Sequence, residues 1–168
     1  MADYSRLLED CHVVRLLRPY VGGKRAELKS TPKVYFIDNG IRNLLFGGVA
    51  PFDRRADRGV LLENLVFSEL LKAINPLLDH LHYWRSKSGA EVDFVLTHRG
   101  RLLACEVKAG DFRQHLTRSA RSFIGIYQPD KFLVVHDGEK GSTTIGGTEV
   151  RFTDIFALSR EVEEFLAD

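Results

Sequence analysis

Apolar residues recur along the chain with two periods, one typical of helices and one typical of strands. The clearest helix is predicted over 59–74, where apolar side chains occupy most of the circumference and Asn75-Pro76 ends the pattern. Further helices are predicted at 3–11, 116–123 and 155–166. Strands are predicted at 13–17, 33–38, 81–85, 91–96, 102–108 and 131–136, and a Gly-rich turn is predicted over 138–147. This order predicts an α/β domain with a mixed central β-sheet flanked by helices.

The predicted strands 91–96 and 102–108 form a hairpin whose register follows from its polar residues. If Arg99-Gly100 is a two-residue turn, counting outward from it makes Asp93 face Glu106 and Glu91 face Lys108. Because side chains alternate along a strand, one face then carries only apolar residues, namely Val92, Phe94, Leu96, Leu103, Cys105 and Val107. The other face carries the four charged residues. An odd loop would bury these charges, so we prefer the even register.

The predicted pairing of Asp93 with Glu106 requires an explanation, since like charges on facing residues destabilise a sheet. Mg²⁺ or Mn²⁺ binds to one or two carboxylates together with water and phosphate oxygens, and would offset this repulsion. Lys108 lies on the same predicted face, where it could position an attacking water. A second explanation stays open, because charged residues on one strand face are most often a solvated surface, and Glu91 could simply pair with Lys108.

Glu63 is a further carboxylate that the pattern places with this group. Val66, Phe67 and Leu70 follow it by three, four and seven positions, so Glu63 shares an apolar stripe of the predicted helix 59–74. A carboxylate that faces the core is costly unless it is paired or bound to a metal. The alternative is a helix residue tilted towards solvent.

These residues, taken in order, resemble the signature of the PD-(D/E)xK nuclease superfamily. Glu63 lies on the first helix, Asp93 follows, and Glu106-Val107-Lys108 comes after a hairpin. Five segments resemble more closely the uncharacterised domain that follows AAA-type ATPase domains in bacterial and archaeal proteins: 33–40, 59–64, 83–86, 89–94 and 106–108.

The resemblance covers about residues 30–140 and implies a domain organisation. It implies a restriction-endonuclease-like core in a PD-(D/E)xK nuclease-like domain over 31–168, with 1–30 as the remnant of a winged-helix-like segment. The sequence has no G-x-x-x-x-G-K-[ST] motif, so an ATPase domain would be a partner in cis or in trans.

The function that the resemblance implies is Mg²⁺- or Mn²⁺-dependent hydrolysis of DNA phosphodiester bonds by an endonuclease-like hydrolase. Asp93, Glu106 and Glu63 would bind the metal, and Lys108 would assist the nucleophile. Phosphate contacts are expected from Arg54, Arg55, Arg58, Lys87, Arg113, Arg118 and Arg121, although a solvated surface explains these equally well. Gln114 and Tyr127 match a helix of some related nucleases, but a solvent-facing Gln114 and a packing Tyr127 are the simpler interpretation. The alternative function is a catalytically silent DNA-binding, docking or regulatory module of an AAA-type ATPase, and a homodimer is compatible with both.

Composition changes this picture in two respects. The net charge of +1 excludes a global basic field, so nucleic-acid contacts must come from a local patch. No run approaches about 18 apolar residues and no signal peptide opens the chain, which predicts a cytoplasmic protein without a membrane segment. Cys11 and Cys105 lie in apolar contexts and are predicted to be buried, reduced thiols.

Overall fold

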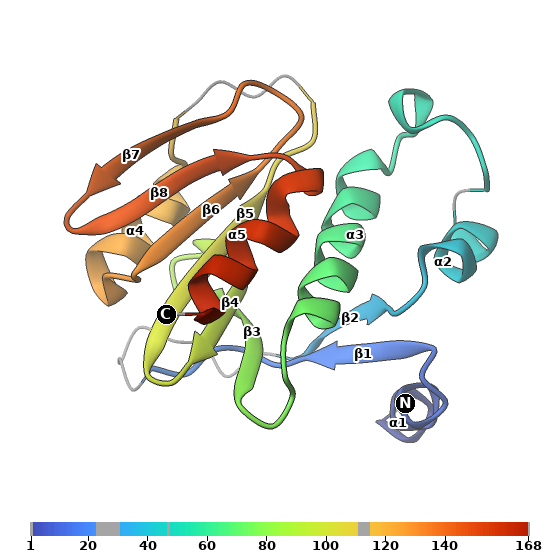
Figure 1. Ribbon diagram of the computed structural model, residues 1–168. Coiled ribbons are helices and arrows are strands. Elements are labelled where there is room, and N and C mark those ends of the chain that lie inside the picture. The colour runs from blue at the N-terminus through green and yellow to red at the C-terminus, as the bar shows by residue number, and fades with distance from the viewer. Residues whose placement is uncertain (1, 23–30, 47, 111–114, 168) are drawn as a thin grey trace.

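A six-stranded mixed sheet forms the centre of the molecule in a computed structural model, which describes residues 2–22, 31–46, 48–110 and 115–167 (Figure 1). Its strands are β3 (Asp79–Arg85), β4 (Glu91–His98), β5 (Arg101–Val107), β6 (Lys131–Val135), β7 (Gly141–Ile145) and β8 (Thr148–Thr153). They lie in the order β3-β4-β5-β6-β8-β7, with β5–β6 and β6–β8 parallel and the other pairs antiparallel.

Helices cover both faces of this sheet (Figure 1). α3 (Arg58–Ala73) and α5 (Ile155–Ala167) pack on one face, where Phe67, Leu96 and Phe165 belong to one buried apolar cluster. α4 (Arg118–Tyr127) connects the parallel strands β5 and β6 across the other face, and Phe123 packs there edge-on against Trp84. The predicted α/β architecture with a mixed sheet flanked by helices is confirmed.

A separate two-stranded ribbon lies beside the main sheet. It consists of β1 (Val14–Leu17) and β2 (Lys33–Phe36), an antiparallel pair that joins the two sides of the boundary predicted at residue 30. α1 (Ala2–Asp10) precedes the ribbon and α2 (Asn39–Phe46) follows it, and a short 3-10 helix, η1 (Phe52–Arg54), leads to α3. The Asn64 side chain of α3 bonds the backbone N–H and C=O of Phe36 at 2.9 Å each, which attaches β2 to the helix.

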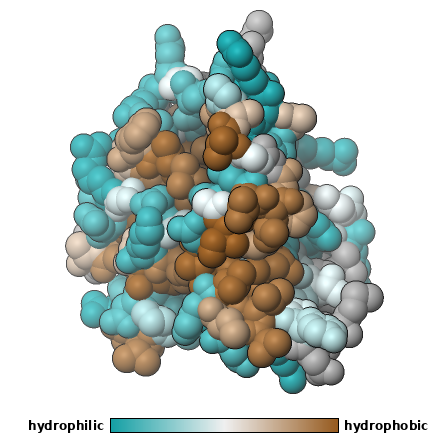
Figure 2. Space-filling model, turned by 90° about the vertical axis from the view of Figure 1, so that its right-hand side faces the viewer, coloured by the Kyte–Doolittle hydropathy of each residue, from teal (hydrophilic) through white to brown (hydrophobic). Residues whose placement is uncertain are grey.

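Apolar side chains remain uncovered on the side of the molecule where α1 and α2 lie (Figure 2). On α2 the exposed ones are Ile41, Leu44, Leu45 and Phe46. Tyr4, Leu7 and Leu8 of α1 are also exposed, and so is Cys11, which directly follows this helix. The predicted burial of the thiols is therefore confirmed for Cys105 and wrong for Cys11, because the apolar stripe of α1 does not face the core.

The remaining differences concern elements that the sequence pattern did not predict. The turn predicted over 138–147 is wrong in its middle, since β7 occupies Gly141–Ile145 and pairs with β8 through a turn at Gly146-Gly147. The polar sequence of β7 gives no apolar alternation. α2 was also missed, although Ile41, Leu44 and Leu45 follow helical spacing. None of the helices in the described part of the chain combines the length and apolar character that a membrane crossing requires.

The register of the β4–β5 hairpin is confirmed from His98–Arg101 to Phe94–Cys105, whereas the predicted pairs Asp93–Glu106 and Glu91–Lys108 lie beyond this ladder. Thr97 pairs with Leu102 and Phe94 with Cys105, around a turn in which Arg99 and Gly100 both have positive φ. The face assignment of β4 is only partly correct, because the β3–β4 register shifts by one residue between His82 and Trp84. This bulge places two residues of β4, Asp93 and Phe94, opposite Tyr83 alone.

The bulge separates Val92 from the apolar face on which the sequence predicts it. Val92 packs in the cluster beneath α4, whereas Phe94 packs in the cluster beneath α3 and α5. Asp93 lies between them and faces the side of α3, where its carboxylate meets Lys33. The irregularity therefore decides in which direction the central carboxylate of the predicted site points.

Candidate functional site

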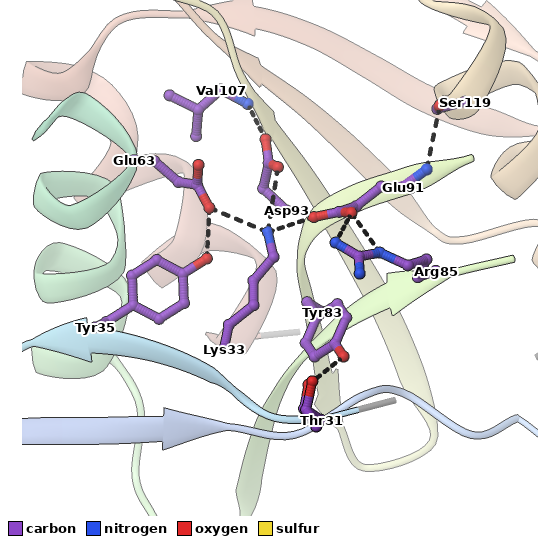
Figure 3. Close-up of polar contacts among 10 residues, drawn as sticks. All are labelled: Thr31, Lys33, Tyr35, Glu63, Tyr83, Arg85, Glu91, Asp93, Val107 and Ser119. Atoms are coloured by element: carbon purple, nitrogen blue, oxygen red, sulfur yellow. Dashed lines mark hydrogen bonds and ion pairs between the residues drawn. The ribbon is translucent and has the colours of Figure 1, made fainter. Parts of the chain in front are cut away.

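The ammonium group of Lys33 lies among three carboxylates that come from α3 and β4 (Figure 3). Lys33 Nζ is 2.5 Å from Glu91 Oε1, 3.1 Å from Glu63 Oε1 and 3.9 Å from Asp93 Oδ1. Tyr35, the next residue on the same face of β2, donates its hydroxyl to Glu63 Oε1 at 2.5 Å. We call Lys33, Glu63, Glu91 and Asp93 the acidic cluster.

A second cation closes the outer side of the acidic cluster. Arg85 Nε and Nη2 lie 2.6 Å and 2.5 Å from Glu91 Oε2, so Glu91 is bound on both oxygens. Burial alone would raise the pKa of Glu91, but Lys33 and Arg85 hold it below its usual value. Burial likewise lowers the pKa of Lys33, and the surrounding carboxylates overcome this effect and raise it, so Lys33 carries a positive charge at neutral pH.

Asp93 is the carboxylate of this cluster with the least compensation. Its Oδ2 accepts the N–H of Val107 at 2.8 Å, which fixes the side chain at the end of the hairpin. Burial and the negative charge of Glu63 raise the pKa of Asp93 to about 7, although the Val107 amide, Lys33 and Lys108 act in the opposite direction. Burial therefore outweighs the groups that favour the charged form of Asp93.

Glu106 and Lys108 form a second group at the end of β5. Lys108 Nζ lies 2.8 Å from Glu106 Oε1. The hydroxyl of Thr117 lies 3.0 and 2.9 Å from the two carboxylate oxygens of the buried Glu106. The hydroxyl oxygen of Thr117 also accepts the N–H of Ala120, so Thr117 is the N-cap of α4. Glu106 thus points towards α4, whereas Asp93 points towards α3.

Comparison with known proteins places most of the chain in one family. Residues 58–155 match the family described as "Domain of unknown function (DUF4143)". The chain belongs to this family. Residues 1–51 match a different model, "Domain of unknown function (DUF8612)".

Two curated relatives are similar to most of the chain. Uncharacterised proteins of Mycobacterium tuberculosis and Mycobacterium bovis are each 29% identical to it over 138 residues, which is 81% of this chain and 31% of each relative. The chain therefore spans about a third of the length of these proteins. Within the chain, the carboxylates of the acidic cluster belong to the DUF4143 region, and Lys33 belongs to the region matched by the second model.

The DUF4143 region brings together only part of the predicted metal site. Glu63 and Asp93 face the same cation, but Glu106 lies on the α4 side with Thr117. The predicted pair Glu91–Lys108 does not form, since Glu91 binds Lys33 and Arg85 while Lys108 binds Glu106. Among the described residues, no group of three or more His, Cys, Asp or Glu side chains is arranged to hold a metal ion.

The position of Lys33 tests whether Glu63 and Asp93 fit a divalent ion. A positive charge already lies between them, within 3.1 Å of Glu63 and 3.9 Å of Asp93. Carboxylate oxygens are the ligands that Mg²⁺ and Mn²⁺ prefer. The two residues therefore fit such an ion at the place of the ammonium group, provided that Lys33 moves aside.

The predicted phosphate contacts divide into two kinds. Arg54, Arg58, Lys87, Arg118 and Arg121 are exposed. The Arg58 guanidinium lies against Gly110, two residues after Lys108, so it borders the site. Arg55 is instead buried in contacts within the fold, with Asp57 at 2.9 and 2.8 Å and with the carbonyl of Gly48 at 2.5 Å.

Three further predicted residues, Arg113, Gln114 and Tyr127, could be compared with the structure only in part. Arg113 and Gln114 lie outside the described residues. Tyr127 packs against Phe123 and Trp84, and its hydroxyl accepts the Trp84 Nε1–H at 3.2 Å, as a packing residue would.

Sequence reasoning missed the basic and hydroxyl groups that bind the carboxylates, namely Lys33, Tyr35, Arg85 and Thr117. Lys33 and Tyr35 alternate on a predicted strand, which indicates that they share a face. Nothing in the sequence indicates that this face meets Glu63.

Proposed function

We propose that this DUF4143 domain is a divalent-metal-dependent phosphodiesterase that acts on DNA and is built on a restriction-endonuclease-like core. The observation that carries the proposal is the convergence of Glu63 and Asp93 on one cation, next to the end of β5 where Lys108 lies. A buried carboxylate whose pKa is raised to about 7 is typical of functional sites.

Each residue of this group has a role in the proposed reaction. A divalent ion held by Glu63 and Asp93 would neutralise a phosphate and activate a water molecule. The Val107 N–H keeps Asp93 turned towards the ion, because it binds Oδ2 at 2.8 Å. Lys108 stabilises the negative charge that develops on the phosphate. Glu106, which Thr117 holds, orients Lys108 and does not serve as a ligand.

The substrate in this proposal is held by phosphate contacts. Arg58 lies on the α3 side of the site, against Gly110, and Arg118 lies at the start of α4, next to Thr117. Contacts of this kind position a nucleic acid without reading its sequence.

A catalytically silent docking or regulatory module of an AAA-type ATPase, in cis or in trans, is the second candidate. The position of Lys33 favours it, because the ammonium group already binds the carboxylates without any metal. In this case the acidic cluster serves to fasten β2 to α3 and β4.

Cleavage of plasmid DNA in the presence of Mn²⁺ tests the first candidate against the second. We expect Asp93→Asn and Lys108→Ala each to reduce cleavage by about 10²-fold or more, since each removes charge stabilisation at the reacting phosphate. Glu69→Gln on α3 is the control, because Glu69 pairs with the exposed Lys72 and not with a residue of the acidic cluster. Cleavage that survives in both site variants contradicts the proposal. Metal-independent DNA binding without cleavage by the unaltered protein supports the silent module.

A further inference from the structure

Lys33 and the carboxylates that it binds lie in regions of the chain that match two different family models. Lys33 lies on β2, in the region matched by the DUF8612 model, whereas Glu63, Glu91 and Asp93 lie in the DUF4143 region. We infer that Lys33 is a tethered cation that occupies the metal position between Glu63 and Asp93, so that the N-terminal region sets the affinity of the site for divalent ions. The inference rests on the proposed function for the nature of the competing ion.

The contacts of Glu63 make this competition direct. Glu63 Oε1 receives two donors, Lys33 Nζ at 3.1 Å and the Tyr35 hydroxyl at 2.5 Å. A carboxylate oxygen offers about two lone-pair directions, so both are occupied. A metal ion that binds this oxygen must therefore displace Lys33 or Tyr35, and both belong to β2.

The charge balance makes the exchange favourable for an ion of charge two. Three carboxylates of the acidic cluster face two cationic side chains, Lys33 and Arg85, which leaves one uncompensated negative charge. A divalent ion in place of the ammonium group balances the charges. The raised pKa of Asp93 is consistent with this deficit, since burial and the neighbouring Glu63 disfavour its charged form.

The Lys33 ammonium can leave without unfolding of the ribbon. Lysine carries its charge on a flexible four-carbon stem. The backbone of the ribbon is held by other groups, namely the Asn64 contacts with Phe36 and the bond from the Tyr83 hydroxyl to the carbonyl of Thr31 at 2.9 Å. Lys33 is therefore a competitor that metal binding displaces, and β2 remains in place to return it.

Mn²⁺ titration of the full chain tests the inference. The affinity is measured by isothermal titration calorimetry, and the midpoint of thermal unfolding is followed at each Mn²⁺ concentration. We expect Lys33→Met to bind Mn²⁺ about tenfold or more tightly than the unaltered protein, because the ion no longer competes with a tethered charge. The gain should disappear in the double variant Lys33→Met/Asp93→Asn. Lys72→Met, which removes an exposed lysine paired with Glu69, should bind like the unaltered protein.

Equal Mn²⁺ affinity of the unaltered protein and Lys33→Met overturns the inference, and so does an absence of binding in both. Lys33→Gln, which keeps a hydrogen-bond donor, replaces Lys33→Met if the latter does not fold. A measurement on the unaltered protein is independent of any variant: Mg²⁺ must shift the side-chain Cε resonance of Lys33 and leave that of Lys72 unchanged. No shift of Lys33 at saturating Mg²⁺ overturns the inference.

The outcomes also separate the inference from the proposed function. If Lys33→Met binds Mn²⁺ more tightly but neither the unaltered protein nor any variant cleaves DNA, the inference is supported and the proposed phosphodiesterase function is rejected. If the unaltered protein cleaves DNA with Mn²⁺ and Lys33→Met binds Mn²⁺ with the same affinity as the unaltered protein, the proposed phosphodiesterase function is supported and the inference is rejected.

Discussion

Burial and a neighbouring negative charge act together on the carboxyl group of Asp93. The pKa of an aspartate in an unfolded chain is about 3.9, whereas burial and Glu63 raise the pKa of Asp93 to about 7 in the folded protein. The folded protein thus binds this proton more tightly than the unfolded chain does. Through this group, stability is highest below the unfolded pKa and falls as the pH rises towards the folded pKa.

Replacement of Asp93 by Asn should remove this pH dependence. The amide cannot ionise and can still accept the Val107 N–H. We expect Asp93→Asn to exceed the unaltered protein in free energy of unfolding by about 1 kcal/mol or more at about pH 8, because one pKa unit corresponds to about 1.4 kcal/mol. The difference should shrink towards about pH 4. Urea unfolding in metal-free buffer measures both, and the exposed Asp53→Asn serves as control. Parallel pH profiles for the unaltered protein and Asp93→Asn would be the contrary result.

Local patterns predicted the acidic residues of the site but not their partners. Glu63 on an apolar helix stripe and Asp93 within an alternating hairpin are unusual at their own positions, so the sequence alone singles them out. Lys33 is an ordinary residue for the start of a strand. Its role depends on which distant segment packs over α3, and this packing is set by the whole fold.

Helices and strands were likewise predicted where a local apolar pattern marks them. Strands and helices with an apolar face, such as β5 and α3, were predicted to within two residues of their observed ends. The polar β7 gave no such signal, whereas α2 was missed although Ile41, Leu44 and Leu45 follow helical spacing. The bulge of β4 was also not predictable, because it is a shift in the pairing register of β3 with β4. Neither strand shows this shift in its own apolar pattern. The bulge turned Asp93 towards α3, so the error in the face assignment became an error in the site.

One buried amide, that of Asn64, binds the backbone of β2 to α3. Asn64 Oδ1 accepts the N–H of Phe36 and Nδ2 donates to its C=O, so the side chain replaces a neighbouring strand. Asn64→Ala leaves both backbone groups without this partner, and an unpaired buried polar group costs about 1–3 kcal/mol. We expect a loss of about 2–4 kcal/mol in the free energy of unfolding and faster hydrogen exchange at the Phe36 amide.

Ser68→Ala is a matched control for Asn64→Ala on the same helix. It removes the 3.3 Å bond to the carbonyl of Ile37 and should cost about 1 kcal/mol or less. Urea unfolding and amide exchange of the two variants check the prediction. Equal losses would mean that Asn64 acts through helix stability and not through β2.

If the domain binds DNA as proposed, charge at the scale of the whole molecule limits how it does so. The net charge of +1 provides no long-range attraction, so binding must depend on a few phosphate contacts near the site. Arg58 and Arg55, only three residues apart, differ in what they can contribute. Arg58 is exposed beside Gly110, whereas Arg55 is buried against Asp57.

The salt dependence of DNA binding distinguishes these two arginines. Each phosphate contact adds about 0.9 to the slope of log K against log salt concentration. Arg58→Ala should therefore weaken binding and lower the slope by about 1, with the free energy of unfolding nearly unchanged. Arg55→Ala should leave the slope unchanged and destabilise the fold, because Asp57 and the carbonyl of Gly48 lose their contacts with the guanidinium. Fluorescence anisotropy in EDTA measures the slope without cleavage. An unchanged slope for Arg58→Ala would place the DNA away from the start of α3. A lower slope for Arg55→Ala would contradict the assignment of Arg55 to contacts within the fold.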